Sequence, residues 1–128
     1  MGYSQTSHLI DMNSLTLAYI GDAIYELYIR EHLINKGIVK VNELQKEAIK
    51  YVSAANQSNI LHALLDKNFF NSKELDIIGR ARNHKGTRHP KNTDVITYKH
   101  ATAFEAIIGY LYLEDKERLD ELMKEVIG

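Results

Sequence analysis

The sequence contains no cysteine and no tryptophan, and it has a single proline among its 128 residues. The lack of cysteine excludes a disulfide framework, a thiol nucleophile and a cysteine-ligated zinc site. No apolar run approaches the roughly 18 residues that a membrane span needs. The N-terminus also lacks the charged start and apolar core of a secretory signal. We therefore expect a cytoplasmic protein with no membrane partner.

The composition is that of one globular domain. Hydrophobic residues make up 45% of the chain and charged residues 26%, which is typical of soluble folded proteins. A chain of this length buries one core, but it is too short for a catalytic domain and a second folded module. We expect a single domain over residues 1–128.

The formal net charge of −1 hides a basic segment between residues 80 and 100. Against one acid, Asp94, this segment carries the basic side chains Arg80, Arg82, Lys85, Arg88, Lys91 and Lys99. Most charged runs are simply solvated surface. The functional alternative is contact with the phosphates of a nucleic acid. The charge pattern by itself leaves both interpretations open.

Hydrophobic spacing predicts an all-α fold. Apolar residues recur every three or four positions, which is the period of a helix that buries one face. The expected helices cover about residues 13–35, 43–67, 71–81, 98–113 and 115–127. A break is expected near 56–59 and a loop over 84–93. Only residues 37–41 show a trace of the alternation typical of a strand.

Helix ends are predicted from capping residues. Gly37 is the expected stop of the first helix. Asn42 and Asn71 are expected to cap the second and third stretches, the latter together with Glu74 in a capping box. Asp94 is placed to cap the helix that follows the basic segment.

Two acids lie in largely apolar segments, Asp22 in LAYIGDAIYELY and Glu105 in ATAFEAIIGYLYL. Removing a carboxylate from water is costly unless a partner or a metal compensates. Small residues accompany both acids and predict a seam where two helices approach closely: Ala18, Gly21, Thr102, Ala106 and Gly109. If the helices cross there, the carboxylates converge and need a cation. Oxygen ligands without cysteine suit Mg²⁺, with Mn²⁺ as a substitute.

An ordinary structural role is the alternative for each acid. A single acid in an apolar helix is often exposed at the helix edge or paired with a basic residue. Glu26 illustrates this ambiguity, because it follows Asp22 by one turn and could serve the same site. Arg30, however, follows Glu26 by four residues, which favours an ion pair between them.

Two segments resemble the ribonuclease III family. LAYIGDAIYELYIR resembles the family signature, an aromatic and an aliphatic residue followed by Gly-Asp-Ala, and ATAFEAIIGYLYLED resembles its second acidic motif. PKNTDVITYKHATAFEAIIGYLYL resembles the short bacterial Mini-III branch, which lacks a double-stranded-RNA-binding domain. The resemblance covers about residues 15–113. It implies an all-α ribonuclease III-like endonuclease domain that forms a homodimer.

The resemblance implies that Asp22 and Glu105 are the catalytic residues and hold Mg²⁺. The full-length family has further acids where this chain has Ala18 and Thr102, a reduction that the short branch shares. The resemblance also implies that Glu26 and Thr102 lie next to the two metal ligands and support them without binding the metal themselves. With no histidine in either acidic motif, the expected nucleophile is a water activated by the metal ion.

The implied activity is hydrolysis of both strands of double-stranded RNA, leaving 5′-phosphate ends. The basic segment would contact the RNA, and Tyr19 would pack at the dimer interface. The implied substrate is precursor large-subunit (23S) ribosomal RNA, with added affinity from the basic loop or from a ribosomal protein. Two rivals remain at this stage: a catalytically inactive RNA-binding dimer, and an all-helical protein-interaction domain.

Overall fold

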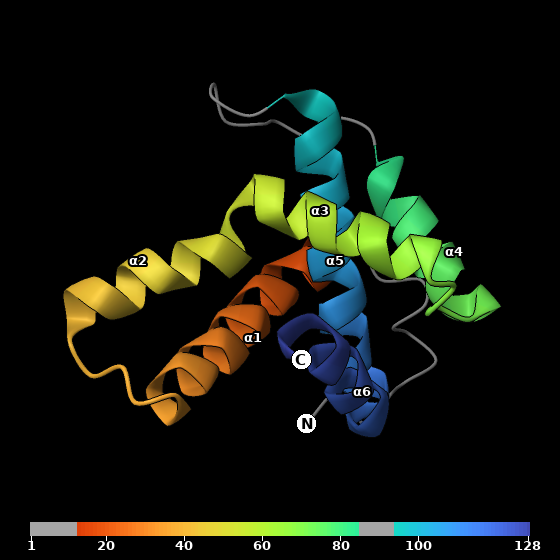
Figure 1. Ribbon diagram of the computed structural model, residues 1–128. Helices are drawn as coiled ribbons and strands as arrows, with labels where there is room; N and C mark the ends of the chain where they lie inside the picture. Colours follow the sequence, from red (N-terminus) through yellow and green to blue (C-terminus); the bar gives the residue numbers. More distant parts are fainter. Residues whose placement is uncertain (1–12, 85–93) are drawn as a thin grey trace.

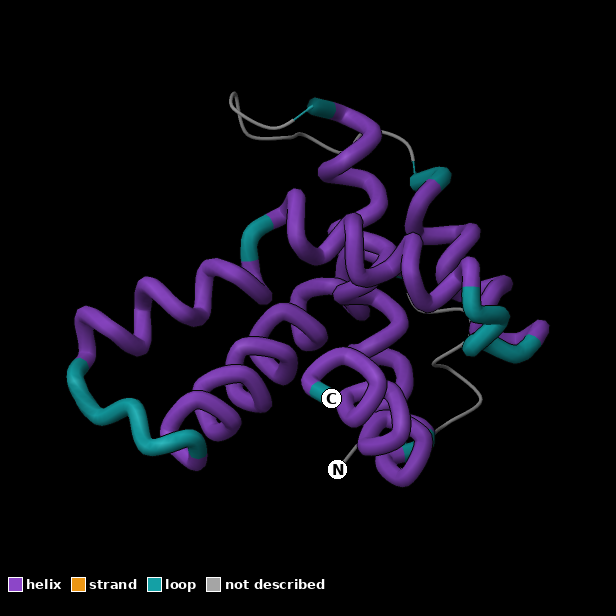
Figure 2. The backbone as a smooth tube through the Cα atoms, viewed as in Figure 1, coloured by secondary structure: helices purple, strands orange, loops and turns teal. Residues whose placement is uncertain are grey.

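The computed structural model describes residues 13–84 and 94–128. Within these ranges the chain is helical, with no strand (Figure 2). The helices are α1 (Ser14–Asn35), α2 (Val41–Val52), α3 (Ala54–Asp66), α4 (Ser72–Arg82), α5 (Val95–Glu114) and α6 (Lys116–Ile127). The all-α prediction is therefore confirmed, while most of the predicted 84–93 loop lies outside the described residues. None of these helices combines the length and apolar character that a membrane span requires.

Helix α5 is the centre of the fold. It packs against α1, α3, α4 and α6, and its most extensive contact is with α1 (Figure 1). Every residue from Ala101 to Leu111 is buried except Glu105. A helix that is apolar on all sides must be surrounded by others, which explains its central place. Glu105, the one acid of this segment, is thus surrounded in the chain by buried residues and is itself half-buried.

Helix α1 buries a single stripe of side chains against α5. The stripe follows the helical period and consists of Leu17, Ala18, Gly21, Tyr25, Ile29 and Leu33. Tyr25 packs edge-on against Phe104 of α5, with ring centroids 5.0 Å apart. Fully burying a large apolar side chain contributes about 1.5–3 kcal/mol, so this stripe fixes how α1 is rotated against α5. The rotation in turn determines where Asp22 points.

The predicted caps at three helix ends are confirmed. Gly37 ends the first helix with a φ of 96°, a conformation that favours glycine. Asn71 and Glu74 form a complete capping box at the start of α4, with reciprocal bonds of 2.9 and 3.0 Å. The Asp94 carboxylate accepts a backbone bond of 2.8 Å at the start of α5. These signals are local, so the sequence alone specifies them.

Two predictions about the second helical stretch are wrong. Asn42 does not cap it, because α2 begins at Val41 and its N-cap, Lys40, makes no side-chain bond. The break lies at Ser53, before the predicted 56–59 region. Ser53 has extended backbone, and its hydroxyl accepts the Asn56 N–H at 3.2 Å. A serine N-cap therefore starts a new helix earlier than the polar residues suggested.

Candidate active site

Helices α1 and α5 cross in direct backbone contact. A Cβ atom added to Gly21 would lie 1.7 Å from the backbone oxygen of Glu105, and one added to Gly109 would lie 2.0 Å from that of Leu17. No side chain fits at either position. The close approach predicted from the small residues is thus confirmed at both glycines. It places the backbone of Glu105 directly against α1.

This crossing brings the carboxyl groups of Asp22 and Glu105 close enough for Asp22 to affect the ionisation of Glu105. The pKa of Glu105 is raised to about 9, chiefly by burial and then by the hydrogen bond and the charge of Asp22. Two like charges in contact disfavour each other's ionisation. The predicted convergence of the two acids is therefore present in the fold.

The two acids differ in exposure. Glu105 is half-buried, whereas Asp22 is exposed, so the apolar segment around Asp22 does not remove its carboxylate from water. Successive residues of a helix are rotated by about 100°, so Asp22 points away from the line of contact that Gly21 occupies. The pair therefore joins a shielded carboxyl group to one that solvent and ligands can reach.

The donor set of this pair fits a hard divalent cation. The ion pairs within residues 13–84 and 94–128 leave Asp22 and Glu105 without a basic partner. In the same residues no third histidine or acid joins them in a cluster that could hold a metal by itself. Mg²⁺ binds carboxylate oxygens and keeps several waters, so two protein ligands are enough. A bound cation would also let both acids ionise together.

Glu26 and Thr102 flank the pair without bonding to it. The predicted ion pair is present, since Glu26 accepts from Arg30 at 3.0 Å. The charge of Glu26 nevertheless helps to raise the pKa of Glu105, so it lies within electrostatic reach. Thr102 is buried one turn before Glu105. Within the described residues, no hydrogen bond joins it to either acid.

Gln57 of α3 is a site residue that the sequence did not reveal. Gln57 is 2% exposed as a residue, and its side-chain amide donates to Glu105 Oε2 at 3.4 Å and to the backbone oxygen of Val52 at 3.2 Å. A signal existed, because Gln57 shares one helical face with the buried Leu61 and Leu64. A polar residue in an apolar stripe needs a buried partner, but the sequence does not say which one.

The basic segment is only partly described. Arg80 pairs with Asp76 at 2.6 Å, whereas Arg82 is exposed and Lys99 is half-buried. The charge of Arg82 contributes to a lowered pKa of His100, after burial and the neighbouring His62. The charge of Arg82 at the end of α4 therefore reaches the first turns of α5. The remaining predicted contacts lie outside the described residues: Lys85, Arg88 and Lys91.

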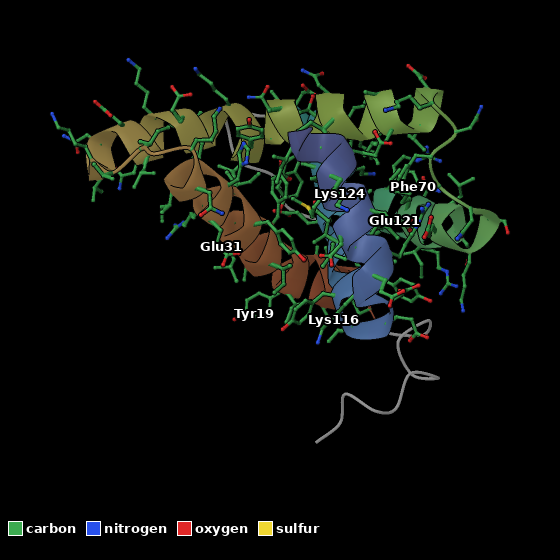
Figure 3. All side chains as sticks on the ribbon, turned by 60° about the horizontal axis from the view of Figure 1, so that its bottom comes forward. Tyr19, Glu31, Phe70, Lys116, Glu121 and Lys124 are labelled. Atoms are coloured by element: carbon green, nitrogen blue, oxygen red, sulfur yellow. The ribbon has the colours of Figure 1, made fainter. Side chains whose placement is uncertain are left out.

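Tyr19 lies on the outer side of α1, where Figure 3 shows its side chain directed away from the other helices. Its exposed fraction is 84%. Leu15 and Leu27 on the same helix are also exposed, at 37% and 52%. An exposed aromatic of this kind is typical of a surface that another molecule covers. The structure contains a single chain, so the dimer contact predicted for Tyr19 stays a prediction.

Comparisons with known proteins agree with these features. The family model described as Ribonuclease III domain matches residues 15–116. A Mini-ribonuclease 3 from Desulfitobacterium hafniense is 52% identical over 103 residues, and the match spans 80% of this chain and 64% of that protein. A Mini-ribonuclease 3 from Staphylococcus aureus is 43% identical over 128 residues, spanning 99% and 96% of the two chains. A crystal structure of a protein from Fusobacterium nucleatum superimposes with a TM-score of 0.77 at 38% identity, covering 91% of this chain and 89% of that one.

Proposed function

Because the chain belongs to the ribonuclease III family of endoribonucleases, we propose that Asp22 and Glu105 are its catalytic metal ligands and that it cleaves double-stranded RNA. The family generally depends on a divalent metal ion and acts on double-stranded RNA. The proposal assigns Mg²⁺ to this chain, with Mn²⁺ as a substitute. One observation supports it above all: the two carboxyl groups meet at a backbone-contact crossing with no basic partner among the described residues.

Each residue of the pair has a distinct role in this proposal. When bound, the cation neutralises phosphate charge and makes water more acidic. Glu105 supplies a shielded carboxylate that must lose its proton for the cation to bind, since the pKa of the group is about 9 without metal. Asp22, which is exposed, supplies the carboxylate that faces the incoming substrate. The nearby charge of Glu26 favours cation binding further.

The RNA would lie along the basic segment. Arg82 and Lys99, together with Arg80, would contact phosphates and ribose hydroxyls and read the shape of the A-form duplex. We assign the same role to the basic residues outside the described ranges: Lys85, Arg88 and Lys91. Two chains would join at the surface around Tyr19, so that each active site cuts one strand.

The natural substrate is proposed from the family resemblance alone. Precursor large-subunit ribosomal RNA is the substrate that the Mini-III branch implies. A ribosomal protein that shapes this RNA would supply affinity that the domain lacks by itself. Neither assignment follows from the geometry of the acid pair, so each needs its own test with natural RNA.

Cleavage of a synthetic RNA duplex with Mg²⁺ tests the site. We expect Asp22→Asn and Glu105→Gln to fold, bind the duplex and lose cleavage. Glu31→Gln is the matched control, because Glu31 is an exposed acid on α1, the helix that carries Asp22 (Figure 3). It should cut like the unmodified chain. Normal cleavage by either site variant would refute the assignment.

Thermal melting distinguishes a metal-dependent nuclease from the catalytically inactive RNA-binding dimer. If the acid pair binds Mg²⁺, millimolar Mg²⁺ should raise the melting temperature of the unmodified chain by mass action. The two site variants should lose this effect. A chain that binds duplex RNA but neither cuts it nor responds to Mg²⁺ would instead be an RNA-binding module.

A further inference from the structure

Gln57 is the one described side chain that donates a hydrogen bond to Glu105. It comes from α3, outside both acidic motifs, and as a residue it is almost completely buried. We propose that Gln57 is a positioning residue, which holds the Glu105 carboxylate in the orientation that faces Asp22. This inference rests on the proposed function of the acid pair as a cation site.

Hydrogen-bond chemistry determines that the amide nitrogen of Gln57, and not its oxygen, faces Glu105. The backbone oxygen of Val52 can only accept hydrogen bonds, and so can an ionised Glu105. The Gln57 amide nitrogen carries two N–H groups, one for each of these acceptors. Both bonds leave the same nitrogen, so the tip of the side chain is fixed between the last turn of α2 and the carboxylate. An anchored donor of this kind restricts the rotation of Glu105 about its side-chain bonds.

The junction between α2 and α3 provides the anchor. Three side chains donate to backbone oxygens in the last turn of α2: Asn56 at 3.3 Å, Tyr25 at 3.0 Å and Gln57 at 3.2 Å. Asn56 and Gln57 are neighbours, and both use an amide for this contact. Of the two, only Gln57 is also bonded to Glu105 within the described residues. Asn56 is thus a natural control for the purely structural part of the role.

The two roles predict different results. If Gln57 only secures the junction, its loss lowers stability and leaves cation affinity unchanged. If it positions Glu105, its loss weakens cation binding as well, because an unrestrained carboxylate must be ordered when the cation binds. Removing a group that orients a metal ligand typically lowers metal affinity by about 10–100-fold.

The test compares Gln57→Met with Asn56→Leu in the full chain. Both changes keep the approximate shape of the side chain and remove its hydrogen bonds. Mn²⁺ binding, measured without RNA by electron paramagnetic resonance, should weaken about tenfold or more in Gln57→Met. It should stay within about twofold in Asn56→Leu, even if both variants melt at lower temperatures. The Mg²⁺ concentration for half-maximal cleavage should rise in Gln57→Met alone.

The outcomes distinguish this inference from the proposed function. Unchanged Mn²⁺ affinity in Gln57→Met, or equal weakening in Asn56→Leu, would overturn the positioning role alone. Mn²⁺ binding that survives Asp22→Asn, or no binding to the unmodified chain, would overturn the cation site and this inference with it. If Gln57→Met does not fold, Gln57→Asn keeps both N–H groups on a shorter stem. It should then weaken Mn²⁺ binding in the same direction by a smaller factor, and unchanged affinity would again overturn the role.

Discussion

Glu74 and Glu105 are two shielded glutamates with opposite surroundings. The Glu74 side chain, 3% exposed as a residue, accepts from Arg118 at 2.8 and 2.9 Å and from the Asn71 backbone at 3.0 Å. Arg118 itself lies over the Phe69 ring, 4.1 Å from its centre. Glu105 instead meets the carboxyl group of Asp22 and receives one long bond from Gln57.

The difference shows that burial of an acid does not by itself mark a functional site. At the junction of α4 and α6, the charge of Glu74 is neutralised within the protein, so this pair serves to join the two helices. At the crossing of α1 and α5, the second group carries the same sign, so compensation must come from outside the chain. A buried acid whose nearest charged partner is another acid is therefore the more informative observation.

The largest expected effect comes from separating the helices at the crossing. Gly21→Ala places a methyl group on the backbone of Glu105 and should lower the free energy of unfolding by more than about 3 kcal/mol. Gly79→Ala is the control, because its added Cβ would meet nothing within 4 Å. That change should leave stability unchanged or raise it by up to about 1 kcal/mol. Denaturant unfolding measures both, and equal effects would contradict the backbone contact.

The two glutamates should respond to the same substitution with opposite signs. Glu74→Gln removes the buried anionic partner of Arg118 and leaves only the exposed Glu121, so it should lower the free energy of unfolding by about 3 kcal/mol. Glu105→Gln removes a carboxyl group that the folded chain keeps protonated at neutral pH, whereas the unfolded chain ionises it. The change should therefore raise the melting temperature in metal-free buffer. Thermal melting at neutral pH with a chelator checks the pair. A loss of stability in both variants would mean that Glu105 is also a structural charge.

The pH dependence of stability should carry a contribution from Glu105, which the comparison with Glu105→Gln isolates from that of other groups such as His100. Its pKa is about 9 in the folded chain against an ordinary 4.5, so between these values the folded state holds a proton that the unfolded state has lost. The metal-free chain should therefore lose stability as pH rises from 4.5 to 9, by at most about 1.4 kcal/mol per pH unit for one proton. Glu105→Gln should flatten this decline in melts across the range, and Glu74→Gln should not. Parallel curves for the unmodified chain and Glu105→Gln would contradict the shifted pKa.

The smallest expected effect concerns the basic region. Arg82→Glu and Lys99→Glu should each weaken duplex binding and reduce the slope of its salt dependence by about one. Lys46→Glu, an exposed change on α2, makes the same charge reversal elsewhere. Filter binding in Ca²⁺ at several salt concentrations compares the three. Equal affinity in all of them would exclude Arg82 and Lys99 from the RNA surface.

The sequence predicted what depends on short-range signals. Asn71 and Asp94 each accept a hydrogen bond from a backbone N–H in the first turn of the helix that they cap, and both predicted caps are present. The convergence of Asp22 and Glu105 was predicted across 83 positions only because glycines beside each acid indicate a crossing. Asn42 shows the opposite case. It has a typical capping pattern, yet α2 begins at Val41 without using it.

The partners that decide the roles of the buried acids could not be predicted. Gln57 reaches Glu105 from 48 positions away, and Arg118 reaches Glu74 from 44 positions away. Neither pair has a local pattern, because each forms only when the helices have packed. The capping box at Glu74 was visible in the sequence, but its buried ion pair was not. Exposure of Asp22 likewise depends on how α1 is rotated against α5.

Manganese in a crystal is the most direct test of the acid pair as a cation site. Anomalous scattering from a crystal soaked in Mn²⁺ should give a peak between the carboxylates of Asp22 and Glu105. The same soak of Asp22→Asn should lose that peak. Both carboxylates resolved in the unmodified chain with no anomalous peak between them would contradict the site.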